Sequence, residues 1–235
     1  MTDEAVILAG GFGTRLSNVV SDRPKSMALI NDKPFLEYQM AFLKQAGIRT
    51  VVLSVGYMKE LIIDHFRDEY LGMKIKYAVE NTPLGTGGGL LNALQLTGQS
   101  PVLTLNGDSI FTADIRGFYK FFRQKSPDIA LALKALPDVS RYGAVLTNEN
   151  QRIVRFEEKS DRQGKGVINA GIYLLNTEQY RQAAPEQKKF SVENDIFAKQ
   201  VSRLNIYGYI SQGTFIDIGI PEDYEKARDV FKTIF

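Results

Sequence analysis

Short runs of apolar residues alternate with longer amphipathic segments through the first half of the chain. The runs at 5–9, 51–55 and 102–105 consist almost entirely of valine, isoleucine, leucine and alanine, which is typical of strands buried on both faces of a parallel sheet. Further strands are expected at 74–79 and 129–133, and the intervening segments keep a helical period. This β-α-β-α order predicts a doubly wound sheet with helices on both faces.

The second half of the chain is less regular. Short strands are expected there at 143–146, 151–156, 167–175, 205–209 and 214–218. We expect them to extend the sheet, partly in antiparallel orientation, and to form one wall of a cleft. Helices are expected at 34–46, 58–70, 88–96, 114–124, 192–202 and 222–231. Because no segment is typical of a linker, a single domain over residues 1–235 is predicted.

Composition and charge exclude several classes of function. The 235 residues include no cysteine, which excludes disulfides, thiolate catalysis and cysteine-based zinc sites. The one histidine, His65, argues against a zinc hydrolase or a Ser-His-Asp triad. A net charge of +2 gives no electrostatic reason to expect nucleic acid or membrane partners. The N-terminus lacks the pattern of a signal peptide, and no run approaches the ~18 apolar residues of a membrane span, so a cytoplasmic location is expected.

The first apolar run leads into a glycine-rich segment, 8-LAGGFGTRL-16. A dinucleotide-binding turn requires a third glycine where Leu16 stands, and the chain contains no Gly-Lys-Ser/Thr triplet of a P-loop. The segment still suits a phosphate site, because glycines after a strand allow backbone N–H groups to approach an anion. Thr14 would add a hydroxyl, and Arg15 and Lys25 would add positive charge.

Other polar motifs follow predicted strands. Asp108 ends the sequence 106-NGD-108 after one apolar run, and Asp217 lies in 215-FIDIGIPEDY-224. A carboxylate at such a strand end is well placed to hold Mg²⁺ against phosphates. The small residues of 80-ENTPLGTGGG-89 would allow the main chain to approach a flat base. The motifs 141-RYG-143, 156-FEEKS-160 and 169-NAG-171 complete the set.

Together these motifs resemble the sugar-1-phosphate nucleotidylyltransferases. The family pattern L-x-G-G-x-G-T-R-L, followed by P-K-x-[ML], matches 8-LAGGFGTRL-16 and then Pro24, Lys25 and Met27. The remaining motifs follow in the family's order as far as Tyr224. The resemblance implies a three-layer α/β/α, Rossmann-like nucleotidyltransferase fold with a mixed, mostly parallel central sheet. It also implies that residues 1 to about 110 bind the nucleotide and that the remainder binds mainly the sugar phosphate.

The resemblance assigns a role to each motif. The catalytic residues would be Arg15, Lys25 and Asp108, and the Mg²⁺ ligands would be Asp108 and Asp217. The nucleotide-binding residues would be Leu8, Ala9, Gly10, Gly11, Gly13, Thr14, Gly85 and Thr86. The substrate-binding residues, on the sugar side, would be Gly143, Glu158, Lys159, Asn169 and Gly171.

The segments PLGTGGG, FEEKS, INAGIYLL and FIDIGIPEDY are most similar to those of D-glycero-D-manno-heptose 1-phosphate guanylyltransferases. This similarity implies transfer of GMP from GTP to the heptose 1-phosphate, giving GDP-heptose for glycan biosynthesis, with Mg²⁺ as cofactor. Mannose 1-phosphate guanylyltransferase and glucose 1-phosphate thymidylyl-, uridylyl- or cytidylyltransferase activities stay open. A catalytically silent nucleotide-sugar sensor is a further alternative, but the complete set of Arg15, Lys25, Asp108 and Asp217 argues against it. The sequence does not indicate an oligomeric state.

Overall fold

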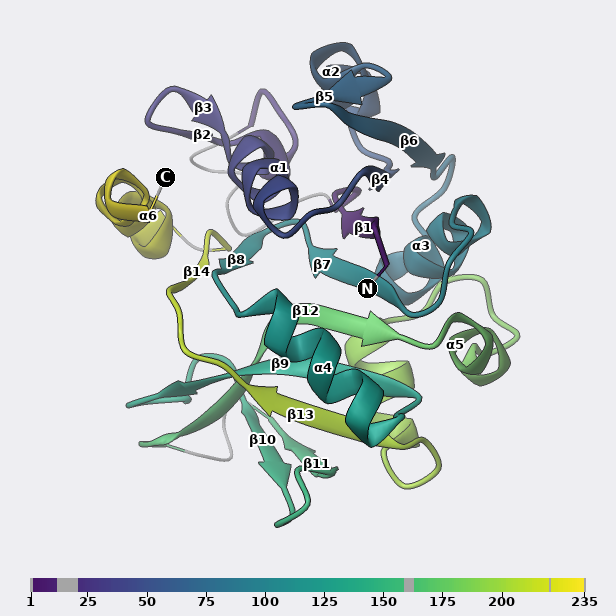
Figure 1. Ribbon diagram of the computed structural model, residues 1–235. Coiled ribbons are helices and arrows are strands. Elements are labelled where there is room, and N and C mark those ends of the chain that lie inside the picture. The colour runs from purple at the N-terminus through teal and green to yellow at the C-terminus, as the bar shows by residue number, and fades with distance from the viewer. Residues whose placement is uncertain (1, 12–20, 159–162, 220, 235) are drawn as a thin grey trace.

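The structure, a computed structural model, describes residues 2–11, 21–158, 163–219 and 221–234 (Figure 1). Within these ranges an eight-stranded sheet forms the centre of the molecule. Its strands, in order across the sheet, are β13 (Ile206–Ile210), β9 (Ile129–Leu136), β12 (Gly166–Leu175), β7 (Val102–Asn106), β1 (Glu4–Leu8), β4 (Thr50–Val55), β6 (Met73–Val79) and β5 (Glu69–Tyr70). Strand β12 is antiparallel to both of its neighbours and β5 is antiparallel to β6, whereas the other pairs are parallel. The predicted mixed, mostly parallel sheet is confirmed.

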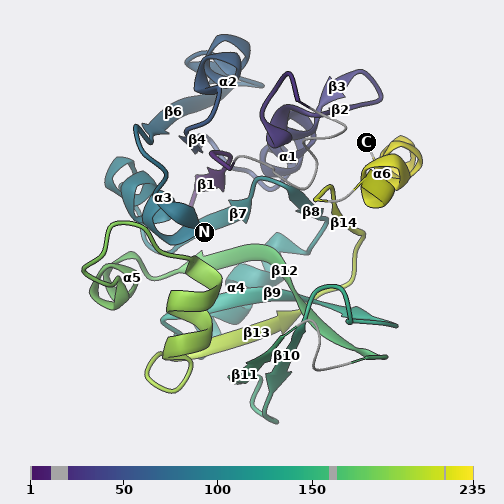
Figure 2. The ribbon, with the colours of Figure 1, turned by 180° about the vertical axis from the view of Figure 1, so that it is seen from behind.

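Helices cover both faces of this sheet, as the opposite views of Figures 1 and 2 show. One face is covered by α1 (Phe35–Gln45), α2 (Lys59–Phe66) and α4 (Ile115–Lys125), and the other by α3 (Gly85–Ala93), α5 (Thr177–Ala183) and the π-helix η3 (Val192–Ala198). Strand β1 shows why both layers are needed, because its side chains alternate between faces. Ala5 and Ile7 are buried in the core under the first set, and Val6 is buried under the second. The three-layer prediction is confirmed.

Smaller elements extend this framework. They are the 3₁₀ turns η1 (Lys25–Met27) and η2 (Leu94–Leu96), the hairpin of β2 (Leu29–Ile30) and β3 (Lys33–Pro34), the strand β8 (Ser109–Phe111) paired with β14 (Phe215–Asp217), the hairpin of β10 (Ala144–Thr147) and β11 (Ile153–Glu157), and helix α6 (Pro221–Ile234). Helix α6 packs its Phe231 ring against Phe35 and Tyr38 of α1, with centroids 5.9 and 4.6 Å apart. This contact brings the C-terminal segment back to the N-terminal half of the chain.

The expected extension of the central sheet is only partly correct. Strands β12 and β13 join it, but β10, β11 and β14 form two-stranded sheets of their own. The physical reason for β10 and β11 is packing, because Val145 and Ile153 are buried against the sheet face that carries α5 and η3. Strand β14 instead pairs with β8, which proves important for the site.

One helix prediction changes, and one helix was not predicted. The helix expected at 58–70 ends at Phe66, and residues 69–70 form β5. Leu71 and Gly72 both have positive φ (52° and 70°), which is the geometry of a two-residue hairpin turn that pairs β5 with β6. Helix α5 was not expected from the sequence, although the side chain of Asn176 caps it by accepting from the N–H groups of Glu178 and Gln179.

Candidate active site

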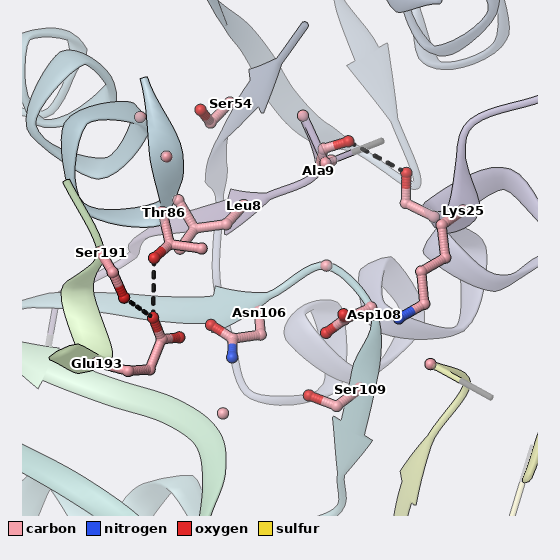
Figure 3. Close-up of a pocket in the computed structure, with 18 of the residues that line it drawn as sticks. Leu8, Ala9, Lys25, Ser54, Thr86, Asn106, Asp108, Ser109, Ser191 and Glu193 are labelled. Carbon is pink, nitrogen blue, oxygen red and sulfur yellow. Dashed lines mark hydrogen bonds and ion pairs between the residues drawn. The ribbon is translucent and has the colours of Figure 1, made fainter. Parts of the chain in front are cut away.

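A cleft of about 860 Å³ lies at the carboxyl ends of the parallel strands β1, β4, β6 and β7 (Figure 3). In open α/β sheets this edge is the usual place for a ligand. The predicted site residues that line the cleft are Leu8, Ala9, Gly10, Gly11, Lys25, Gly85, Thr86, Asp108, Asn169, Gly171 and Asp217. The fold therefore gathers motifs that are spread over more than 200 residues of sequence.

The other predicted site residues fall into two groups. Gly13, Thr14, Arg15 and Lys159 lie outside the described residues. Gly143 and Glu158 are described but do not line the cleft, whereas Tyr142, next to the first of them, does. Gly143 has φ +77°, and a Cβ there would lie 2.4 Å from the Glu157 carbonyl oxygen, so the glycine is needed for this turn to approach β11.

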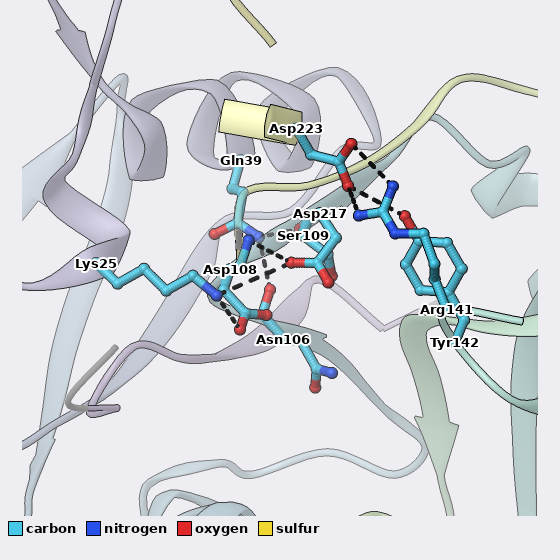
Figure 4. A network of polar contacts seen from close by, with 10 residues as sticks. Lys25, Gln39, Asn106, Asp108, Ser109, Arg141, Tyr142, Asp217 and Asp223 are labelled. Carbon is cyan, nitrogen blue, oxygen red and sulfur yellow. Dashed lines mark hydrogen bonds and ion pairs between the residues drawn. The ribbon is translucent and has the colours of Figure 1, made fainter. Parts of the chain in front are cut away.

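The Lys25 side chain is the positive charge at one end of the cleft (Figures 3 and 4). Its Nζ donates to Asp108 Oδ2 at 2.7 Å and lies 3.9 Å from Asp217 Oδ1. Only 10% of the lysine side chain is exposed, against 41% of Asp108 and 26% of Asp217. One cation thus faces two carboxylates that remain accessible to a ligand.

Pairing of β8 with β14 brings the two aspartates together although they are far apart in the sequence. Ser109 lies opposite Asp217 in this antiparallel pair. The N–H of Ile218 donates to the Asp108 carbonyl oxygen at 3.0 Å, and the N–H of Gly219 donates to Asp217 Oδ1 at 2.7 Å. The backbone therefore sets the position of one aspartate, and a backbone donor orients the carboxylate of the other.

A buried glutamine supports the turn that carries the first aspartate. Gln39 Nε2, on α1, donates to the carbonyl oxygens of Asn106 and Ser109, both at 2.7 Å (Figure 4). The N–H of Gly107 donates to the Leu8 carbonyl oxygen at 3.1 Å, and a Cβ on Gly107 would lie only 2.4 Å from that oxygen. The turn is thus held against both β1 and α1. Sequence reasoning missed Gln39, because nothing in a helical segment marks which residue will face a distant turn.

The donor chemistry of Asp108 and Asp217 fits a divalent cation. Mg²⁺ is usually bound by one or two carboxylates together with substrate phosphates and waters. Two carboxylates close to the same Nζ could provide the protein's share of such a site. Among the described residues no group of three or more acidic, histidine or cysteine side chains gathers to hold a metal alone.

The glycine run 87–89 also serves packing within the protein. Gly87 and Gly88 allow close contact with residues 188–190, while the predicted approach of this segment to a base stays a prediction. A Cβ on Gly87 would lie 2.3 Å from the Phe190 ring, and one on Gly88 would lie 2.3 Å from the Lys188 carbonyl oxygen. Gly85, at φ +71°, does line the cleft. Gly87 and Gly88 are therefore needed for packing, whereas Gly85 and Gly89 lie at the cleft.

Glu80 is a cleft residue to which the sequence analysis gave no role. It follows β6, and its Oε1 accepts from Ser54 Oγ at 2.9 Å. Its Oε2 accepts from the N–H of Leu84 at 3.0 Å, which fixes the loop before α3. A Cβ on Gly89 would lie 2.5 Å from Glu80 Oε1, so the glycine makes room for this carboxylate. The signal was present as an acidic residue at a strand end.

A charged contact connects the segment that carries the cleft residue Tyr142 to helix α6 (Figure 4). Arg141 Nη1 donates to Asp223 Oδ1 at 3.3 Å, and the hydroxyl of Tyr142 donates to Oδ2 of the same aspartate at 3.3 Å. The Tyr142 ring packs edge-on against Phe215, with centroids 5.5 Å apart. Burial, followed by the charge of Asp223, raises the pKa of Tyr142 to about 12. Its hydroxyl therefore stays protonated at neutral pH and keeps its hydrogen bond to Asp223.

Both the sequence and the fold relate this chain to known proteins. In the described ranges, no helix is long and apolar enough to cross a membrane. The chain is 42% identical to the D-glycero-α-D-manno-heptose 1-phosphate guanylyltransferase of Aneurinibacillus thermoaerophilus, over 96% of each chain. It is 43% identical to the enzyme of the same name from Campylobacter jejuni, over 94% of this chain and 96% of the relative. The crystal structure of HddC from Yersinia pseudotuberculosis complexed with GMP-PN has a TM-score of 0.86 and 35% identity, over 97% of this chain and 99% of that one. The family model described as nucleotidyl transferase matches residues 4–233, and the chain belongs to this family.

Proposed function

We propose that the protein transfers GMP from GTP to D-glycero-D-manno-heptose 1-phosphate, giving GDP-heptose and pyrophosphate for glycan biosynthesis. The observation that carries this proposal is the arrangement of Lys25 with Asp108 and Asp217 in the cleft of a chain that spans nearly the whole length of two heptose guanylyltransferases. The neighbouring structure complexed with GMP-PN supports guanine as the base. The cytoplasmic location expected from the sequence stays a prediction.

The chemistry of this reaction suits the residues present. An oxygen of the sugar phosphate attacks the α-phosphorus of the nucleotide, and pyrophosphate leaves from the opposite side. Because the nucleophile is already an anion at neutral pH, no general base is required. Catalysis then consists of holding two anionic substrates together and neutralising their charge. This agrees with a cleft whose Lys25 ammonium group is largely buried.

We assign the charged residues as follows. Lys25 binds phosphate oxygens and helps to overcome the repulsion between the two substrates. Asp108 and Asp217 would hold Mg²⁺, which would supply Lewis-acid stabilisation of the phosphates. Arg15 would stabilise charge on the departing pyrophosphate, and Lys159 would bind the phosphate of the sugar. These last two assignments rest on the sequence pattern.

The two substrates would occupy different parts of the cleft. The nucleotide would lie against the ends of β1 and β4 and the start of α3, in the part of the chain before about residue 110. The sugar phosphate would lie against β12, where Asn169 Oδ1 accepts from the N–H of Gly171 at 3.0 Å. Gly171 has φ +75°, and a Cβ there would lie 2.6 Å from Ser109 Oγ. Gly143 and Glu158 remain proposed contacts of the sugar.

Pyrophosphate release tests the proposed function. The five common nucleoside triphosphates would each be paired with heptose, mannose and glucose 1-phosphates, with Mg²⁺ present. The highest kcat/KM is expected for GTP with the heptose 1-phosphate. A higher value with mannose 1-phosphate or with another nucleotide would replace the proposed substrates. Absence of release with every pair would contradict catalysis and favour a nucleotide-sugar sensor.

A further inference from the structure

The segment 188–194 lies across the cleft from Lys25, and Lys189, Ser191, Glu193 and Asn194 of this segment line the cleft (Figure 3). Two backbone hydrogen bonds hold this segment against α3. The N–H of Gly87 donates to the Phe190 carbonyl oxygen at 2.9 Å, and the N–H of Phe190 donates to the Leu84 carbonyl oxygen at 3.0 Å. The π-helix η3 begins immediately afterwards, and π-helical turns are rare and often occur at functional sites. The first turn of η3 is therefore placed firmly at the edge of the cleft.

The carboxylate of Glu193, in this first turn, is held by two hydroxyl groups. Its Oε2 accepts from Thr86 Oγ1 at 2.8 Å and from Ser191 Oγ at 3.0 Å. The same hydroxyl oxygens accept from the N–H groups of Val192 at 3.0 Å and Asn194 at 3.2 Å. Each hydroxyl has one proton, and its oxygen already accepts from a backbone N–H. The protons of Thr86 and Ser191 are therefore both donated to Glu193 Oε2. The side chain is thus fixed in orientation before any ligand binds.

The second oxygen, Glu193 Oε1, has no hydrogen-bond partner among the described residues. The residue is half-buried and lines the cleft, and Figure 3 shows this oxygen on the side toward Asn106, away from both hydroxyls. An ionised carboxylate accepts hydrogen bonds and cannot donate them. An anionic phosphate oxygen would therefore repel Glu193 Oε1. A sugar hydroxyl, in contrast, could donate a hydrogen bond to it.

The helix that carries Glu193 packs against β12, the strand along which the sugar phosphate would lie. Tyr173, on β12, is completely buried, and its hydroxyl accepts from Asn169 Nδ2 at 3.2 Å. Burial raises the pKa of Tyr173 well above its ordinary value, and the negative charge of Glu193 adds to this effect. The Tyr173 ring also packs edge-on against Phe197 of η3, with centroids 5.0 Å apart, so the helix that carries Glu193 lies against the β12 wall that carries Asn169.

We propose that Glu193 is a specificity-determining residue whose Oε1 accepts hydrogen bonds from ring hydroxyls of the sugar 1-phosphate. Thr86 and Ser191 are positioning residues for this carboxylate, which gives Thr86 a role other than contact with the base. The inference rests on the proposed function, because it assigns the recognition of one of that reaction's two substrates.

The test compares Glu193→Gln with Glu186→Gln, which alters an exposed glutamate of the neighbouring segment that does not line the cleft. Loss of a hydrogen bond to a charged group should raise KM for the sugar 1-phosphate about 10-fold or more in Glu193→Gln. The KM for GTP should stay within about twofold of the parental value, because the substitution removes a contact with the sugar 1-phosphate alone. Thr86→Val should show a smaller change in the same direction. The Glu186 variant should match the parent.

Deoxy analogues of the sugar 1-phosphate provide a second readout. The parent should discriminate against the analogue that lacks the recognised hydroxyl, and Glu193→Gln should largely lose this discrimination. An unchanged KM for the sugar 1-phosphate, or an increase confined to GTP that points to its ribose, would overturn the inference. If Glu193→Gln does not fold, Thr86→Val and the analogues decide the matter alone. Turnover by the parent is measured first, so failure of the proposed function is recognised separately.

Discussion

Replacement of Lys25 by methionine separates the catalytic role of the site from its structural role. The substitution retains most of the apolar stem and removes the ammonium group that lies 2.7 Å from Asp108 and 3.9 Å from Asp217. Without that charge, the two carboxylates face each other and the substrate phosphates lose a cation. We expect a large loss of turnover with little change in folding stability.

The exposure of the partners sets the size of the two effects. Asp108 is 41% exposed and Asp217 is 26% exposed, so water can solvate both when the lysine is gone. Because both carboxylates stay in contact with water, their pairs with Lys25 should contribute about 1 kcal/mol, as exposed ion pairs do, and less than a fully buried pair. Removal of one group that stabilises charge in the transition state typically lowers kcat by about 10²- to 10³-fold. The catalytic effect should therefore be at least twice as large in free energy as the structural one.

Steady-state pyrophosphate release and thermal unfolding would measure these two quantities on the same preparation. Lys232→Met is a matched control, because Lys232 forms a surface pair with Asp229 at 3.2 Å and its side chain is 64% exposed. The control should leave kcat unchanged. A Lys25→Met enzyme that retains more than about a tenth of parental kcat would refute the assigned role. A fall in the unfolding free energy well beyond that of the control would show instead that the ion pair is mainly structural.

Three further substitutions test other parts of the site. Arg15→Ala should lower kcat by at least ~10²-fold in the pyrophosphate-release assay, and near-normal turnover would contradict its assignment. Lys159→Ala should mainly raise KM for the sugar 1-phosphate, so an unchanged KM would count against contact with that phosphate. Gly107→Ala would place a Cβ 2.4 Å from the Leu8 carbonyl oxygen, where only backbone movement relieves the clash. It should cost about 1–3 kcal/mol and lower Tm by several degrees, and an unchanged Tm would show that the turn adjusts freely.

Much of the fold was predictable because its evidence is local. The strands near residues 5, 51 and 102 were recognised from continuous apolar runs, and the structure buries such residues as Ile7, Val52 and Leu103 on both faces of the sheet. The places that differ depend on backbone geometry or distant packing. Arg67 ends α2 at a positive φ of 51°, and the adjacent hairpin of β5 and β6 takes the rest of the expected helix.

The position of the cleft was likewise implicit in the sequence. Glycines, Asn106 and Asp108 follow apolar strands that are parallel, so their positions at the same edge of the sheet follow from the strand order. The identity of the charged motifs also follows from the sequence, because each motif is contiguous. The sequence of each motif does not show how far it lies from the other motifs in the folded protein.

Tertiary structure decided those distances and the partners of each group. Pairing of β8 with β14 brings Asp217 beside Asp108, and Gln39 reaches the same turn from a helix. The contact of α3 with residues 188–190 explains the glycine run and carries Glu193 into the cleft. The sequence by itself therefore determined the elements and the chemistry available at their ends, since both depend on neighbouring residues. Only the folded chain determined which of these groups meet, because pairing across long stretches of sequence depends on the packing of the whole sheet.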